Sequence, residues 1–386
     1  MRSDGRSGTP RLRRGGAVLA ALLIGAGLVA PAPASGEPLP TTYQPVTATV
    51  WANSPTTTAE YRPGGGYTAN STGGDVFVRR TGTGAYTVIL EGAATTGGVA
   101  HAVAYGGGPV HCTVTAWYPS LLGGDDQLIL VRCFAATGTP TDSRFVASFT
   151  SVRQVSRGRL AYFVTDQTVP TGVRTIPSSY RYDSTGGVIS YERLSTGRYR
   201  FHLNPNPDTE VGYTFPMTHV TALGSTAVHC QTGWPDSRQV WCVNAAGNPV
   251  DALFTVTYGS RVDLLGRATG PRFASGTLYA NWISDGRISG DGYNSTVGSW
   301  STGASGRHLG TGRYEIAFQG TATAFGTALA NAHLDNLEGS RPRGWCVVAG
   351  WGSAGPDTRV LVNCYAYFGV PANLNARISF TTWPAG

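Results

Sequence analysis

The chain has 386 residues, of which 13% are charged and 41% hydrophobic, and its formal net charge is +7. Five arginines and one aspartate lie in residues 1–34; the rest of the chain has 24 basic and 21 acidic residues, a net charge of +3. Such a balance offers no clustered basic face, so the composition argues against a nucleic-acid partner. All basic residues are arginines, which is typical of high-GC coding and singles out no arginine.

The N-terminus predicts export. Three arginines, Arg11, Arg13 and Arg14, precede an uncharged apolar run over residues 17–30, which ends in the small-x-small pattern Ala32-Pro33-Ala34. The run is too short to span a bilayer, and no later apolar run reaches about 18 residues. We therefore expect residues 1–34 to be a signal peptide and the mature protein to be secreted and extracellular, without a membrane span.

The first part of the mature chain divides into short β-rich runs separated by Gly, Pro, Asn, Asp and Ser clusters. The expected strands are 46–52, 75–80, 86–91, 99–105, 111–117, 127–134 and 145–149. The loops between them are too short for crossover helices, so neighbouring strands should pair antiparallel. Residues 326–338 have some helical character, but they replace a strand of the earlier chain, and we expect a strand there too.

Three sequence phrases recur with a period of about 115 residues. The turn Asn70-Ser71-Thr72-Gly73-Gly74 returns at 183–187 and, altered, at 294–298; a Gly-x-Tyr phrase stands at 84–86, 197–199 and 312–314. A Cys, Trp, Cys series follows each. This repetition predicts three repeats, 35–154, 155–268 and 269–386. The expected fold is all-β, with three tandem antiparallel β-sandwich-like modules; the alternative is a six-bladed β-propeller with two four-stranded blades per repeat.

The six cysteines supply two thiols to each repeat, in a chain with an export signal. We predict three disulfides between neighbouring antiparallel strands of one repeat: Cys112–Cys133, Cys230–Cys242 and Cys346–Cys364. A metal site is the alternative, but no CxxC spacing supports it. Each bridge would close a loop of about 12 to 21 residues and contribute about 2–3 kcal/mol through the unfolded state.

Four histidines occupy matching positions in the first two repeats. His101 and His111 are separated by ten residues, as are His219 and His229. Hairpins centred on Gly106 and Gly224 would place each pair directly opposite, so that two imidazoles share a metal ion. Zinc prefers three or four ligands, and the third repeat has His333 and Trp345 in this region instead. The alternative interpretation is a polar cross-strand pair on the solvent face.

No catalytic residue is nominated. The phrase Thr226–Cys230 is similar to the histidine segment of trypsin-like proteases, but the Gly-Asp-Ser-Gly-Gly segment is missing. Gly-x-Ser-x-Gly, HExxH and phosphate-binding Gly-Lys motifs are missing too. The aspartates stand mainly in turns, where their side chains bond nearby amides, and a carboxylate pair from distant strands stays open. We expect no cofactor.

The tryptophans Trp117, Trp234 and Trp351 recur beside a turn in each repeat. An indole face in such a position can hold a sugar ring, or it can cap the core of its module. These three residues are therefore the candidate ligand-binding residues. Three linked weak sites would gain avidity.

The turn, the Gly-x-Tyr phrase and the Cys, Trp, Cys series resemble repeats in uncharacterised secreted proteins of actinobacteria, over Thr41 to Gly386. The resemblance implies an exported repeat protein and brings no activity with it. We expect a non-catalytic secreted binding or surface-interaction protein, with a cell-wall or environmental polysaccharide or another surface protein as partner. The alternatives are a hydrolase with its site between repeats and a protease inhibitor using the loop Pro119–Asp126.

Overall fold

The computed structural model describes residues 45–382 except 65, 121–123, 207–215, 234–237, 268–270, 279–292, 299–302, 324 and 335–343. Thr42–Gly386 is one compact unit. Its described residues form β-strands and two short 3-10 turns, without an α-helix. The all-β fold is therefore confirmed, and the stretch with helical character is strand β21 (Gly326–Leu334).

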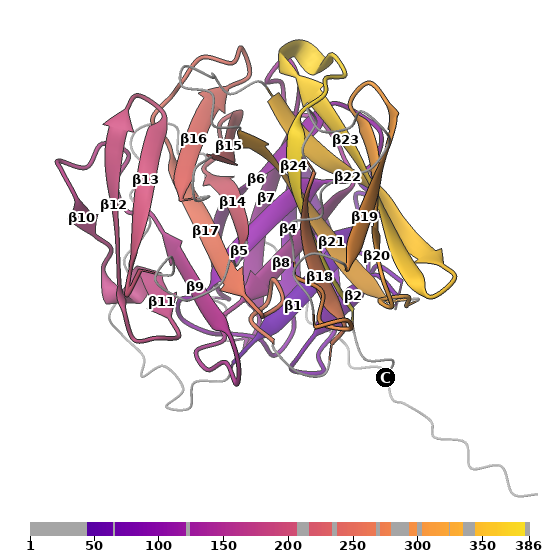
Figure 1. The fold of residues 1–386 in the computed structure, drawn as a ribbon, viewed down its shortest axis with the longest axis horizontal. Helices are drawn as coiled ribbons and strands as arrows, with labels where there is room; N and C mark the ends of the chain where they lie inside the picture. Colours follow the sequence, from indigo (N-terminus) through magenta and orange to yellow (C-terminus); the bar gives the residue numbers. More distant parts are fainter. Residues whose placement is uncertain are drawn as a thin grey trace, which may run out of the picture. The chain divides into compact units, whose positions relative to one another are not determined.

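The strands, most of which are labelled in Figure 1, fall into three modules. The first module contains β1 (Thr47–Ala52), β2 (Thr68–Asn70), β3 (Val76–Gly82), β4 (Ala85–Leu90), β5 (Val99–Ala104), β6 (Val110–Pro119), β7 (Gln127–Ala135) and β8 (Phe145–Thr150). The second contains β9 (Arg159–Val164), β10 (Arg174–Thr175), η1 (Ser178–Tyr180), β11 (Arg181–Asp183), β12 (Val188–Ser195), β13 (Arg198–Asn204), β14 (Met217–Leu223), β15 (Val228–Gly233), β16 (Gln239–Asn244) and β17 (Leu253–Ser260). The third contains β18 (Phe273–Leu278), β19 (Ala304–Gly310), β20 (Arg313–Phe318), β21, β22 (Gly344–Ala354), β23 (Asp357–Ala366), η4 (Tyr367–Gly369) and β24 (Asn375–Thr382).

Each module has two antiparallel half-sheets. The first half-sheets have the strand orders β2-β1-β8-β5, β11-β9-β17-β14 and β18-β24-β21. The second half-sheets are β3-β4-β7-β6, β12-β13-β16-β15 (with β10 beside β12) and β19-β20-β23-β22. The first half-sheet joins strands from both ends of its module, whereas a propeller blade is a separate four-stranded sheet of one repeat. The structure thus favours modules over blades.

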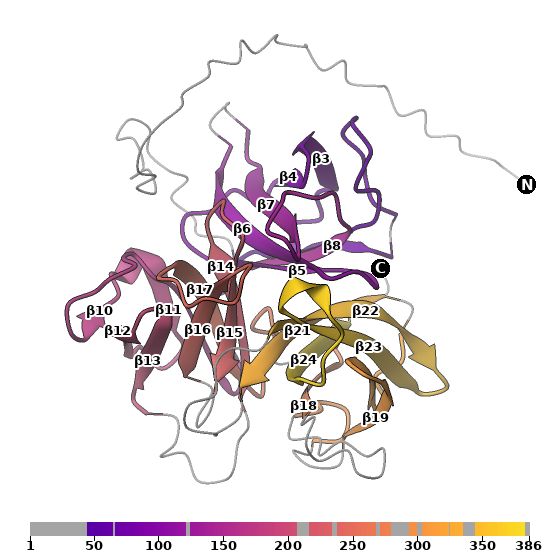
Figure 2. The ribbon, with the colours of Figure 1, turned by 90° about the horizontal axis from the view of Figure 1, so that it is seen from above.

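Parallel bridges join the modules into a ring. β14 of the second module pairs with β6 of the first through Leu223 and Val114. β21 of the third pairs with β15 of the second through His333 and Thr232. A bridge between Tyr105 and Val348 links the first module to the third. In Figure 2 the three modules surround a common centre, near which β5, β14 and β21 lie. These parallel contacts between repeats were not expected from the sequence.

The first half-sheets are buried on both faces. In β5, Ala100, Ala102 and Ala104 belong to the apolar core of the first module, while His101 alternates with them and lies on the other face. β14 repeats the pattern, because Val220 and Ala222 enter the core of the second module. The period of two therefore turns one face of each first half-sheet toward its own core and the other toward the neighbouring modules.

All three predicted disulfides are present: Cys112–Cys133, Cys230–Cys242 and Cys346–Cys364. Each joins residues directly opposite in neighbouring antiparallel strands. Their Cα atoms are 4.0–4.1 Å apart. This is closer than the ~5.5 Å typical of disulfides. The cysteines occupy non-hydrogen-bonded positions, where strands approach most closely: the amide of Cys133, for example, donates to Gly84.

The Gly-x-Tyr phrase has a structural role, because its Gly amide and Tyr hydroxyl donate hydrogen bonds to the loop before each module's last strand. Asp142 accepts hydrogen bonds from Arg80, from the amide of Gly84 and from the buried Tyr86 hydroxyl. Asp251 does the same with Arg193, Gly197 and Tyr199. In the third module Asn373 occupies the position of these aspartates, and its Oδ1 accepts hydrogen bonds from the Gly312 amide and the Tyr314 hydroxyl. The phrase therefore recurs because it fixes the loop before each module's last strand.

Candidate functional site

The four candidate histidines pair differently from the prediction. β5 pairs with β8 and β6 with β7, so His101 lies opposite Ser148 and His111 opposite Phe134. The hairpin that would bring His101 to His111 is wrong, and so is the solvent-face interpretation, because His101, His111 and His219 are 3%, 4% and 1% exposed. The rings meet instead between modules: the ring centres of His101 and His219 are 6.4 Å apart, and those of His111 and His229 are 6.1 Å apart.

His101 and His219 are fully hydrogen-bonded across module boundaries. His101 bonds to the hydroxyls of Thr221 (Nδ1, 3.0 Å) and Thr257 (Nε2, 2.8 Å) of the second module. His219 bonds to Asn331 Oδ1 (2.6 Å) and Ser379 Oγ (2.7 Å) of the third. Burial lowers the pKa of His101 to about 3 and that of His219 to about 4, so both are neutral. They hold modules together.

In the third module, Leu329 occupies the position that His101 and His219 have in the first two modules. Leu329 lies opposite Ser379, as His219 lies opposite Thr257. Val103 and Leu329 belong to the same apolar cluster. The sequence has thus exchanged the histidine and its hydrogen-bond partner together, because a buried polar group needs a partner. His333 bonds instead to the Thr232 hydroxyl, at 3.0 Å across the boundary between the second and third modules.

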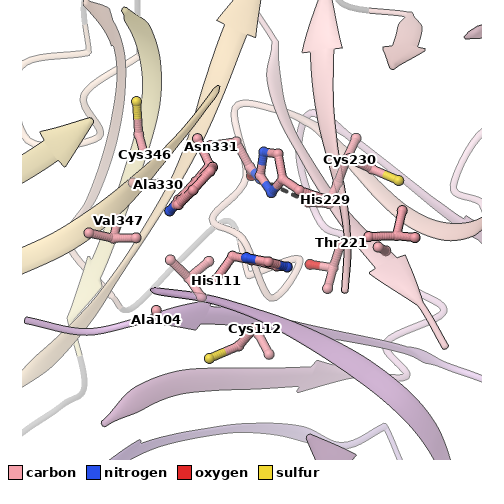
Figure 3. A pocket seen from close by; sticks show the side chains of 16 residues that line it. Ala104, His111, Cys112, Thr221, His229, Cys230, Ala330, Asn331, Cys346 and Val347 are labelled. Carbon is pink, nitrogen blue, oxygen red and sulfur yellow. Dashed lines mark hydrogen bonds between the residues drawn. The ribbon is translucent and has the colours of Figure 1, made fainter. Parts of the chain in front are cut away.

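A second group of rings forms the wall of a cavity between the modules, which we call the axial cavity. The ring of Trp345 lies 5.5 Å from that of His111 and 6.2 Å from that of His229, centre to centre. The cavity has a volume of about 20 Å³, and corresponding residues of all three modules line it, including Cys112, Cys230 and Cys346. In Figure 3, His111 and His229 extend into this space.

Several nitrogens around the axial cavity are buried without a hydrogen-bond partner among the described residues. They are His111 Nδ1 and Nε2, His229 Nε2 and Trp345 Nε1. Burial lowers the pKa of His111 to about 4 and that of His229 to about 3. At neutral pH each ring is therefore uncharged and has one free lone pair to offer.

None of the described residues that line the axial cavity carries a carboxylate. Several aspartates are engaged elsewhere with arginines, in the pairs Asp142–Arg80, Asp166–Arg174, Asp183–Arg159, Asp251–Arg193 and Asp263–Arg267. Across the described part of the chain, no group of three or more His, Cys, Asp or Glu side chains is arranged to hold a metal ion. Among the described residues, the cavity therefore offers neutral nitrogen ligands.

The three candidate tryptophans lie in different surroundings. Trp117 packs against the core of the first module, and its indole N–H donates to the Gly97 carbonyl at 3.1 Å. Trp234 lies outside the described residues. Trp351 joins Trp51, Tyr67 and Tyr105 in a group that we call the aromatic cluster, where the ring centres of Tyr105 and Trp351 are 5.2 Å apart.

The aromatic cluster lies where the first and third modules meet, beside the bridge between Tyr105 and Val348. Trp51 is its centre, at 4.1 Å from Tyr67, 4.7 Å from Tyr105 and 5.9 Å from Trp351 between ring centres. Tyr67 is 42% exposed, and the Arg144 guanidinium lies 5.4 Å from the ring centre of Tyr105. None of these partners of Trp351 belongs to a repeated phrase, so the repeats do not predict them.

Comparison with protein-family models, curated proteins and solved structures finds no match to the chain. Among the residues that the structure describes, none forms a helix with the length and apolar character of a membrane span.

Proposed function

We propose that the protein is an exported, non-catalytic binding protein that holds a chain of a cell-wall or environmental polysaccharide on the aromatic cluster. The observation that carries this proposal is the contiguous group of Trp51, Tyr67, Tyr105 and Trp351 at the junction of two modules, with Tyr67 exposed. The three disulfides suit the oxidising extracellular environment.

Chemistry favours a saccharide as the ligand. Sugar rings present C–H groups on their faces and hydroxyls at their edges, so they match aromatic side chains that combine an apolar face with a polar atom. Tyr67 and Tyr105 offer hydroxyls, and Arg144 beside Tyr105 offers guanidinium donors. Because the rings already pack against one another, little side-chain entropy is lost on binding.

The hydrolase alternative needs an acid in a cavity between repeats. The described residues that line the axial cavity include His111 and His229 and no Asp or Glu, so they do not supply that acid. The protease-inhibitor alternative depends on the loop Pro119–Asp126, part of which lies outside the described residues. A panel of secreted proteases tests it: inhibition would favour that alternative.

The proposal is tested by retention of the purified protein on insoluble peptidoglycan, chitin and cellulose. We expect one of these to retain the protein, and Trp351→Ala and Tyr67→Ala each to weaken retention by about tenfold or more, as for an interface residue worth over 1 kcal/mol. Trp117→Ala is the matched control, because it removes an equivalent indole that packs on the core of one module. Equal retention of all variants, or no retention of the unaltered protein, would refute the proposal.

A further inference from the structure

We propose that His111 and His229 form a binding site for a soft monovalent metal ion, Cu(I) or Ag(I), in the axial cavity, with Trp345 as the third wall. This site is separate from the aromatic cluster and does not rest on saccharide binding. It also differs from the metal sites expected from the sequence, since its two ligands come from different modules.

The first support is a set of ligands that nothing else uses. His111 is 4% exposed, and neither of its ring nitrogens has a partner among the described residues, nor does His229 Nε2. By contrast, His101 and His219 use both ring nitrogens in hydrogen bonds. Leaving a buried polar atom unpaired costs about 1–3 kcal/mol, so an occupant that binds these nitrogens stabilises the fold.

The second support is size. The axial cavity, at about 20 Å³, has no room for an organic ligand. A site needs roughly 10–15 Å³ to hold one water molecule, so one ion or one water fits. Figure 3 shows the two histidines approaching this space from two different strands, β6 and β15.

The third support is geometry. Ions such as Cu(I) and Ag(I) accept two nitrogen ligands in line. Two metal–nitrogen bonds of about 2 Å, with roughly 1 Å from each nitrogen to its ring centre, place the ring centres about 6 Å apart. The observed separation is 6.1 Å, with 74° between the ring planes. A linear site leaves each ring free to rotate about its metal–nitrogen bond, so this angle is compatible with coordination.

Charge selects a monovalent ion over a divalent one. Zinc needs three or four ligands, and a buried charge without a counter-ion is costly; the described residues that line the axial cavity supply two imidazoles and no carboxylate. The Trp345 ring also lines the axial cavity, with its centre 5.5 Å from the ring centre of His111 and 6.2 Å from that of His229.

The two histidine ligands are also held in place by packing and are uncharged. Phe134 stacks on His111 with 5.5 Å between ring centres, which fixes the orientation of that ring. Both histidines are neutral at pH 7, since burial lowers the pKa of each to about 3–4, so no proton has to leave when a metal binds.

The test is titration of the purified, disulfide-intact protein with Ag(I) in chloride-free buffer at pH 7, followed by calorimetry and native mass spectrometry. Ag(I) is used because it needs no reductant, which would attack the disulfides. We expect one tightly held Ag(I) per chain. His111→Phe and His229→Phe should each weaken binding by more than the roughly 10- to 100-fold that follows loss of an outer-shell partner.

Both phenylalanine variants should fold, because Trp345 already places an aromatic ring at the equivalent position of the third module. His101→Leu is the matched control: it removes a buried histidine whose nitrogens are occupied, and it should leave Ag(I) binding unchanged. Thermal unfolding of each variant verifies folding. Failure of the protein to bind Ag(I), or equal binding by the His111→Phe/His229→Phe double variant, would overturn the proposal and leave the cavity to water. Equal loss in a folded His101→Leu variant would overturn it as well.

Discussion

The hydrogen-bonded histidine between the first and second modules can be converted into the apolar contact that the chain already uses between the third and first. His101→Leu copies Leu329, and Thr221→Val copies Val103. We expect the two single substitutions to destabilise the protein and the double substitution to recover much of the loss, because the partners are then removed together.

The magnitude follows from the contacts. Thr221→Val leaves His101 Nδ1 without the Thr221 hydroxyl; His101→Leu leaves the hydroxyls of Thr221 and Thr257 without the imidazole. Each unpaired buried group costs about 1–3 kcal/mol. In the double variant neither His101 Nδ1 nor the Thr221 hydroxyl is left unpaired, so the two effects should fall short of additivity by these two costs, about 2–3 kcal/mol at the lower end of the cost per group and within the range measured for contacting residues.

The assay is equilibrium unfolding in guanidinium chloride at pH 7, with disulfides intact, for the unaltered protein, the two single variants and the double variant. Val103→Thr, placed in the apolar contact of the third interface, serves as the reverse control and should destabilise by about 1–3 kcal/mol, because it buries a hydroxyl among apolar groups. Strict additivity of His101→Leu and Thr221→Val would refute the reasoning.

Three further predictions follow from the cores and the module boundaries. Burial lowers the pKa of His111 from 6.5 to about 4, so the unfolded state binds the proton first, and stability should fall by roughly 3 kcal/mol for this residue as pH drops from 6.5 to below 4; acid titration of the unfolding midpoint measures it, and His111→Phe should flatten the curve. Gly84→Ala places a Cβ 2.5 Å from the Cys133 carbonyl oxygen, whereas Gly172→Ala, at a similar positive φ, meets nothing within 4 Å; thermal unfolding should show Gly84→Ala to be more destabilising by about 1–3 kcal/mol, and equal losses would contradict the close approach. Replacing Cys230 and Cys242 by alanine opens a loop closed over a separation of 12 residues and should cost about 2–3 kcal/mol; thiol titration of the unaltered protein should find no free thiol before reductant is added.

Local patterning predicted the strands and disulfides well. The expected strands 86–91 and 127–134 correspond to β4 (Ala85–Leu90) and β7 (Gln127–Ala135), because turn residues separate β-rich runs of alternating polarity. The disulfides followed from two cysteines per repeat in an export context. These features depend on neighbours within about twenty residues of one another, which a repeat displays directly.

The arrangement of the modules could not be predicted in this way. Their parallel bridges involve one or two residue pairs each, such as Leu223 with Val114, and leave no periodic signal. One feature of the sequence does indicate burial between modules. β5 contains no charged residue, and only His101 interrupts its apolar sequence, which is typical of a strand buried on both faces. That feature argues against a solvent-facing histidine.

The candidate site depended on these unpredicted contacts. The repeats predict Trp351 as one of three equivalent candidate tryptophans, but its partners Trp51 and Tyr105 lie in a different module, about 300 and 246 residues away in the chain. A motif search within one repeat therefore finds the tryptophan and misses the cluster. The same holds for His111 and His229, which meet only across a module boundary.

The most direct test of the central claim is the number of saccharide sites per chain. Calorimetric titration with a soluble oligosaccharide of the polysaccharide that retains the protein should give one site, weakened about tenfold or more by Trp351→Ala, because the aromatic cluster of the described residues lies at one junction, where the first and third modules meet. Three equivalent sites, each sensitive to its own tryptophan (Trp117, Trp234 or Trp351), would contradict this account and favour binding by repeated weak sites.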